Sequence, residues 1–162
     1  MDEKTRSISA IWKSKKKSVE ECTELVLNFL LHLKDYDYNL FGVWYEKGNS
    51  KKKALEKKVE LSIGYIQSAL KKNWDKKFDD LGARISYWTG NEDEDKSSSI
   101  SFNVGAYGDK SFNKNSCIIN LPQEYKANEK DNYPHDLIDL MKGYWKPDKI
   151  LVNGEVFENK VS

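Results

Sequence analysis

The chain has few of the residues that attack substrates or bind transition metals. Its 162 residues include two cysteines, Cys22 and Cys117, and two histidines, His32 and His135. No Cys-x-x-Cys or His-x-x-x-His pair occurs, so the usual ligand sets of structural zinc are missing. Cys22 and His32 lie about 15 Å of helical rise apart on one predicted helix, which excludes a catalytic dyad between them. A catalytic dyad of Cys117 and His135 is not excluded. We expect the thiols of Cys22 and Cys117 to be small buried groups that form no disulfide.

Phosphate-binding loops and membrane-spanning runs are missing as well. Neither Gly-x-Gly-x-x-Gly nor Gly-x-x-x-x-Gly-Lys-Ser/Thr occurs, and the sequence Gly-Ala-Tyr-Gly at residues 105–108 follows a predicted strand without opening a helix. The apolar runs are far shorter than the roughly 20 residues that cross a bilayer. Residues 1–4 (Met-Asp-Glu-Lys) lack the apolar segment of a secretory signal. We therefore expect a cytoplasmic protein with no membrane contact, no cofactor and no bound metal.

Charge is abundant but unevenly distributed along the chain. Charged residues make up 33% of the sequence, and the net charge is +1. Residues 1–78 hold 17 basic and 11 acidic side chains, whereas residues 79–162 hold 10 basic and 15 acidic ones. If the two halves form surface patches of opposite sign, these patches would steer a charged partner.

Lysine runs at residues 13–17, 51–58 and 71–77 raise the alternative of a nucleic-acid-binding module. Nucleic-acid readers favour arginine, whose planar fork matches phosphates and base edges, but the chain has only Arg6 and Arg84. The acidic second half would also repel a polyanion. Nucleic acid therefore stays the alternative partner, and a solvated surface is the simpler interpretation of the lysine runs.

Hydrophobic periodicity predicts three helices. The first begins at Ser18, where a glutamate three residues on completes a capping box, and its apolar side chains share one face. The second is capped by Ser62, and the third has Pro134 in its first turn and ends at Gly143. The basic residues 51–58 could form a further short helix.

Alternation with a period of two predicts strands at residues 7–12, 40–45, 83–89, 100–106, 117–121, 149–152 and 155–157. The three strands between residues 83 and 121 are joined only by loops, which predicts an antiparallel meander. Asn153-Gly154 predicts a hairpin with a type I′ turn. We expect an α+β fold in a single domain over residues 1–162: an antiparallel sheet, made of the central three-stranded meander plus N-terminal and C-terminal strands, with helices packed on one face.

Three segments run an apolar or aromatic stretch into a glycine, at residues 41–48, 85–90 and 102–108. Large aromatics at the ends of rigid strands suit protein recognition, and a nearby acidic loop would supply charge. The simpler interpretation places the tryptophans in the core and makes the acidic loop a solvated hairpin tip. The candidate partner-binding residues are the aromatic Trp44, Tyr45 and Trp88 and the acidic Asp79, Asp80, Glu92, Asp93, Glu94 and Asp95.

Several short motifs also follow one another in a recognisable order. They are ISAIW at residues 8–12, SVEEC at 18–22, WYEKG at 44–48, ISYWTG at 85–90, VGAY at 104–107, NSCIINLP at 115–122 and PD at 147–148. In order and spacing, over about residues 8–152, these motifs resemble the bacterial immunity protein 52 family.

The resemblance implies an antidote of a polymorphic toxin system, used in competition between bacteria. Such a protein is encoded beside a toxin and neutralises it by binding it one to one, without being an enzyme. The associated toxin is typically a nuclease with a restriction-endonuclease-like domain. No residue set defines the toxin interface of the family, so none carries over. The lysine-rich composition departs from DNA mimicry by an acidic surface, and a small enzyme that uses Cys117 or a carboxylate remains a rival interpretation.

Overall fold

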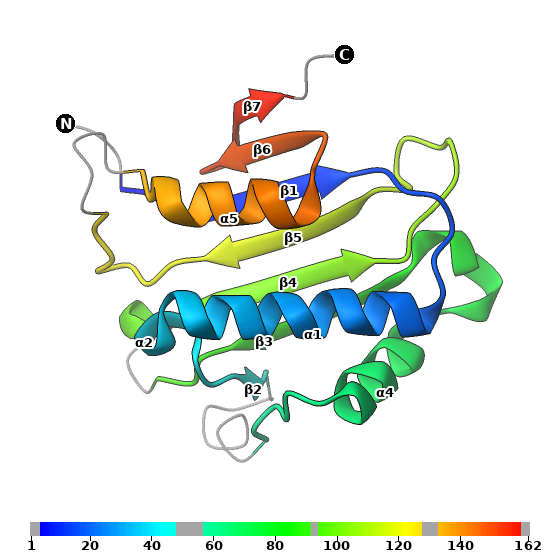
Figure 1. Ribbon diagram of the computed structural model, residues 1–162, viewed down its shortest axis with the longest axis horizontal. Coiled ribbons are helices and arrows are strands. Elements are labelled where there is room, and N and C mark those ends of the chain that lie inside the picture. The colour runs from blue at the N-terminus through cyan, green and yellow to red at the C-terminus, as the bar shows by residue number, and fades with distance from the viewer. Residues whose placement is uncertain (1–3, 48–56, 92–93, 128–132, 160–162) are drawn as a thin grey trace.

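One antiparallel sheet of seven strands forms the centre of the molecule, and α1 and α5 lie side by side across one of its faces (Figure 1). The computed structural model describes residues 4–47, 57–91, 94–127 and 133–159. The order across the sheet is β2-β3-β4-β5-β1-β6-β7. The strands are β1 (Ser7–Trp12), β2 (Tyr45–Glu46), β3 (Ala83–Trp88), β4 (Ser99–Val104), β5 (Asn115–Asn120), β6 (Lys149–Val152) and β7 (Glu155–Asn159). The helices are α1 (Val19–Tyr36), α2 (Tyr38–Phe41), α4 (Ile63–Asn73) and α5 (His135–Trp145), with the short 3₁₀ segments η1 (Lys76–Leu81) and η2 (Glu94–Lys96). The predicted α+β class is confirmed.

The helix-covered face of the sheet contains the core. One row of directly paired residues crosses five strands and consists of Ile85, Phe102, Cys117, Ala10 and Ile150. All five are buried under the helices. Because neighbouring residues of a strand point to opposite faces, this row places every second residue of each strand in the core. The period-two pattern of the sequence therefore sets the register.

The predicted antiparallel meander is confirmed, because β3, β4 and β5 are consecutive in the chain and neighbours in the sheet, with antiparallel pairing. The predicted hairpin is confirmed as β6 and β7. Its two turn residues, Asn153 and Gly154, have φ angles of 53° and 82°. A type I′ turn requires positive φ at both positions, and asparagine followed by glycine is the pair that adopts it with least strain.

Helix α1 begins as predicted. The Ser18 hydroxyl accepts a hydrogen bond from the backbone N of Glu21 (3.0 Å), and the Ser18 backbone N donates to Glu21 Oε1 (3.1 Å). This capping box satisfies two amides at the helix start that have no partner within the helix. The buried residues of α1 are Cys22, Thr23, Val26, Leu27, Phe29, Leu30 and Leu33.

The second predicted helix is confirmed as α4, with Ser62 as its N-cap. The third is confirmed as α5, but the prediction that Gly143 ends it is wrong. The helix continues to Trp145, and the chain leaves it at Lys146, which adopts a left-handed φ of 47°. Burying the Trp145 ring in the core outweighs the roughly 1 kcal/mol that a glycine costs inside a helix.

The strand predicted at residues 40–45 is wrong over most of its length. Asp37 accepts a hydrogen bond from the backbone N of Leu40 (3.1 Å) and caps the four-residue helix α2. This local cap turns the chain and buries Phe41 against Trp44, with ring centroids 6.1 Å apart. The helix predicted at residues 51–58 falls almost wholly outside the described residues.

The opposite face of the sheet has a different composition, and we call it the outer face. Nearly all of its side chains are half-buried or exposed, in contrast to the core face. In the part of the chain that the structure describes, no helix has the length and apolar character needed to cross a membrane. The outer-face residues of the five central strands are Arg84, Ser86, Trp88, Ser99, Ser101, Asn103, Ser116, Ile118, Asn120, Ser7, Ser9, Ile11, Lys149 and Leu151.

Candidate functional site

The outer face consists mainly of small polar side chains. The hydroxyls of Ser86 and Ser101 lie 2.8 Å apart on neighbouring strands, and Asn120 Nδ2 donates to Ser99 Oγ (3.0 Å). Short side chains that bond to one another have little conformational freedom left to lose. These outer-face side chains would therefore lose little conformational entropy if the face were covered.

Of the three aromatic candidates, two lie together and one does not. Tyr45 and Trp88 are direct partners across β2 and β3, on the outer face, and both are half-buried. Trp44 precedes Tyr45 and points to the other face, where it is 1% exposed. Trp44 is thus a core residue in this structure and offers a partner no surface.

The acidic candidates Asp79 and Asp80 are already engaged within the protein. Asp79 Oδ2 accepts a hydrogen bond from the Tyr107 hydroxyl (2.8 Å) and lies 3.6 Å from Lys16 Nζ. Asp80 Oδ2 accepts from Asn113 Nδ2 (3.1 Å). The hydrogen bond to Asp79 raises the pKa of the Tyr107 hydroxyl, because losing that proton would place two negative charges together. These two carboxylates fasten η1 to the chain that follows β4.

The remaining acidic candidates follow β3 in the sequence. Glu92 and Asp93 are outside the described residues, and η2 contains Glu94 and Asp95. The backbone oxygen of Asp95 accepts a hydrogen bond from the backbone N of Glu124 (3.4 Å). Strand β3 separates η2 from η1 by roughly 17 Å, at about 3.3 Å per residue. The structure therefore does not bring Glu94 and Asp95 together with Asp79 and Asp80.

A site that the sequence did not indicate lies where α1 begins. A cleft of about 650 Å³ opens between the start of α1, the end of α4 and η1. We call it the lysine cleft; its lining residues are Lys16, Lys17, Ser18, Val19, Lys71, Trp74, Lys76 and Asp79. The first and third lysine runs of the sequence contribute to it together, although more than fifty residues separate them.

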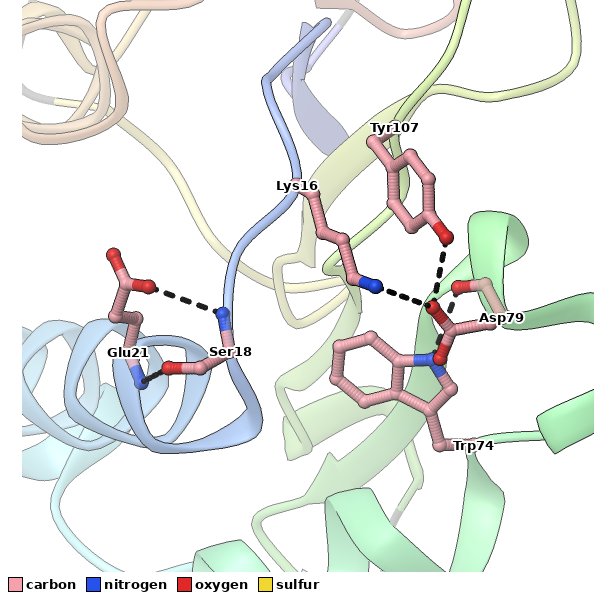
Figure 2. A network of polar contacts seen from close by, with 6 residues as sticks. All are labelled: Lys16, Ser18, Glu21, Trp74, Asp79 and Tyr107. Carbon is pink, nitrogen blue, oxygen red and sulfur yellow. Dashed lines mark hydrogen bonds and ion pairs between the residues drawn. The ribbon is translucent and has the colours of Figure 1, made fainter.

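The Trp74 ring is the aromatic wall of the lysine cleft, and two contacts fix its position. Its Nε1 donates a hydrogen bond to the backbone oxygen of Asp79 (3.0 Å). Its edge lies so close to Gly105 that a Cβ there would sit 2.1 Å from the ring. Figure 2 shows Lys16, Tyr107 and Trp74 converging on Asp79, with the capping pair Ser18 and Glu21 beside them.

The lysine cleft carries an excess of positive charge. Its lining contains four lysines and one carboxylate, that of Asp79. The Asp79 carboxylate already forms an ion pair with Lys16 and accepts a hydrogen bond from Tyr107. At the start of α1, the Glu21 carboxylate has a lowered pKa, chiefly because it accepts the hydrogen bond from the Ser18 backbone. That carboxylate therefore stays charged and already occupies the positive end of α1.

The two thiols lie in the core. Cys22 and Cys117 are free and 0% exposed. Burial raises the pKa of Cys22 to about 11 and holds the pKa of Cys117 well above its usual value. Both sulfurs are thus protonated at neutral pH, and a reagent or substrate does not reach them in this conformation. Within the described ranges, no group of three or more His, Cys, Asp or Glu side chains is placed to hold a metal ion.

Comparison with known protein families gives a match to this chain. The family model described as Immunity protein 52 matches residues 4–162, which is nearly the whole chain. A search of curated proteins found none that matches.

Proposed function

The chain belongs to the immunity protein 52 family, and on this premise we propose that it neutralises a cognate bacterial toxin by forming a stoichiometric, non-catalytic complex with it. The match over residues 4–162 is the observation that carries the proposal, because it includes every strand and helix described above. Immunity protein families are generally non-enzymatic. The buried, protonated thiols agree with an inhibitor that acts by occupying a surface rather than by turning over a substrate.

We propose that the toxin is a nuclease with a restriction-endonuclease-like domain. The support is the sequence resemblance to a family whose partner toxins are typically of that class. An inhibitor stops such an enzyme by covering its substrate cleft or by binding beside the cleft and blocking access. Either mode needs a rigid surface, and a seven-stranded sheet over a single continuous core supplies one.

The outer face is our proposed contact surface, and its aromatic pair Tyr45 and Trp88 is the proposed anchor. Aromatic side chains contribute a large contact area for the loss of only two rotatable bonds. The neighbouring serines and asparagines add hydrogen-bonding groups that are already held in place. Trp44 is left out of this surface because it is buried on the other face.

Co-expression with the toxin encoded beside this chain tests the function. Cells that make the toxin alone are expected to die, and cells that make both proteins are expected to survive. The purified pair is expected to elute as a one-to-one complex with a dissociation constant of about 1 nM or tighter, because free toxin must be kept near zero. Killing that is unchanged in the presence of the chain, or survival without any complex, would contradict the proposal.

Truncation of the aromatic anchor tests the surface. Trp88→Ala is expected to weaken toxin binding about twentyfold, because a central aromatic contact dominates the energy of an interface. The matched control is Phe112→Ala, in the loop between β4 and β5, whose side chain is 63% exposed and off the outer face. We expect it to change the affinity less than about twofold. Affinities are measured by surface plasmon resonance on variants whose circular dichroism matches the parent, and equal effects of the two changes would exclude Trp88 as an anchor.

A further inference from the structure

We propose that the lysine cleft receives an acidic loop of the toxin, so that one or more Asp or Glu side chains of the partner enter the space between α1, α4 and η1. This inference rests on the proposed function, because it names a second part of the surface that the complex uses. It differs from the outer-face anchor in position and in chemistry: the anchor is aromatic, and the cleft is cationic.

The first support is an excess of lysine over carboxylate among the residues that line the cleft. Lys16 is paired with Asp79, whereas no ion pair with a described carboxylate joins Lys17, Lys71 or Lys76. The three lysines come from the segment before α1, the last turn of α4 and η1, and the packing of α4 against α1 brings them together. Like charges gathered around one cleft repel each other, and an acidic group placed among them removes that repulsion.

The second support is the shape and rigidity of the cleft. A volume of about 650 Å³ accommodates several side chains of a loop and lies within the range of ordinary ligand sites. Its aromatic wall, Trp74, is held by the backbone of Asp79 and packed against Gly105. The Lys16 ammonium is held by Asp79 and lies 5.4 Å from the Tyr107 ring centroid. These two parts of the site are already ordered, so they lose little entropy on binding.

Three observations favour a carboxylate-bearing protein loop over a nucleic acid. The Glu21 carboxylate already fills the start of α1, where a phosphate would otherwise bind. The cleft has no arginine, the residue best suited to pair with phosphates through two bonds. Two exposed acids, Glu20 and Asp75, adjoin lining residues in the sequence and would repel a long polyanion more than a short acidic loop.

A pair of charge-reversed double variants tests the proposal in the complex of the full chain with its toxin. Lys71→Glu with Lys76→Glu changes two cleft residues. The matched control, Lys72→Glu with Lys77→Glu, changes the two neighbouring exposed lysines that do not line the cleft. Both pairs alter the net charge equally and sit in the same elements, so any long-range effect of charge is common to them.

We expect the cleft pair to weaken toxin binding about thirtyfold or more, and the control pair to change it by less than about threefold. The association rate of the parent is expected to fall as salt is raised from about 0.05 to 0.5 M, and the cleft pair is expected to lose most of that dependence. Circular dichroism and thermal unfolding are the controls that both variants are folded.

The opposite results are equally specific. Equal weakening by both pairs, or no weakening by the cleft pair while the parent binds tightly, would overturn the cleft proposal and leave the proposed function standing. A parent that fails to bind the toxin would overturn both. Binding of labelled single-stranded DNA and RNA is measured in the same way. If the parent binds them tightly and only the cleft pair loses that binding, the cleft is a nucleic-acid site and the acidic-loop proposal is overturned.

Discussion

Trp145→Ala is expected to lower the free energy of unfolding by about 4 kcal/mol, the largest loss that we predict for a single side chain. The Trp145 ring is 6% exposed and stacks on Trp12 with centroids 4.6 Å apart and planes 20° apart. It also lies against Phe29 (5.1 Å) and Phe102 (6.2 Å). One ring thus joins α5 to β1, α1 and β4, so its removal opens a cavity that no single element can close.

Urea denaturation followed by far-ultraviolet circular dichroism measures this loss. The conservative variant Trp145→Phe keeps a flat apolar ring in place and is expected to cost about 1 kcal/mol. A loss below about 1 kcal/mol for Trp145→Ala would show that the four aromatic rings do not depend on one another as the packing indicates.

Gly82→Ala is expected to lower the free energy of unfolding by about 3 kcal/mol or more. Gly82 links η1 to β3 with φ of 71° and ψ of −156°, a conformation that residues with a Cβ rarely adopt. A Cβ at this position would lie 2.2 Å from the backbone oxygen of Val104 and 2.7 Å from the backbone N of Ala106. Backbone atoms of the adjoining chain cannot swing aside, so both strain and collision act against alanine.

Gly143→Ala is the matched control for this prediction. Gly143 lies inside α5, and no atom lies within 4 Å of the place where its Cβ would be. Alanine there is expected to raise the free energy of unfolding by about 0.5–1 kcal/mol, because it restricts the unfolded chain and favours helix. The two changes, measured by the same urea titration, should therefore have opposite signs. A value for Gly82→Ala within about 0.5 kcal/mol of the parent would contradict the strain argument.

The regular elements follow from local patterns in the sequence. The capping box at Ser18, the alternation in β1 and in the meander, and the Asn153-Gly154 turn each combine a preference of the backbone with a match to one buried face. The two errors arose where another contact outweighed the local signal. Asp37 caps a short helix ahead of an expected strand, and Trp145 carries α5 past the glycine that was expected to end it.

The candidate site depends on tertiary structure more than the regular secondary-structure elements do. Trp44 and Tyr45 are adjacent and equally aromatic, yet only Tyr45 reaches the outer face. Asp79 and Asp80 are bonded to Tyr107 and Asn113, which no spacing in the sequence indicates. Two lysine runs, for which a solvated surface is the simpler interpretation of the sequence, supply the four lysines of one cleft.

The amino-acid sequence by itself determined the family, the α+β class and which residues of the central strands face the core, because each depends on short-range order and on a periodicity that can be counted along the chain. Tertiary structure alone decided which aromatics face outward, which carboxylates are engaged within the protein and which lysines meet. The physical reason is that such contacts join residues far apart in the chain, and their distances are set by how α4, α1 and η1 pack and not by any local preference.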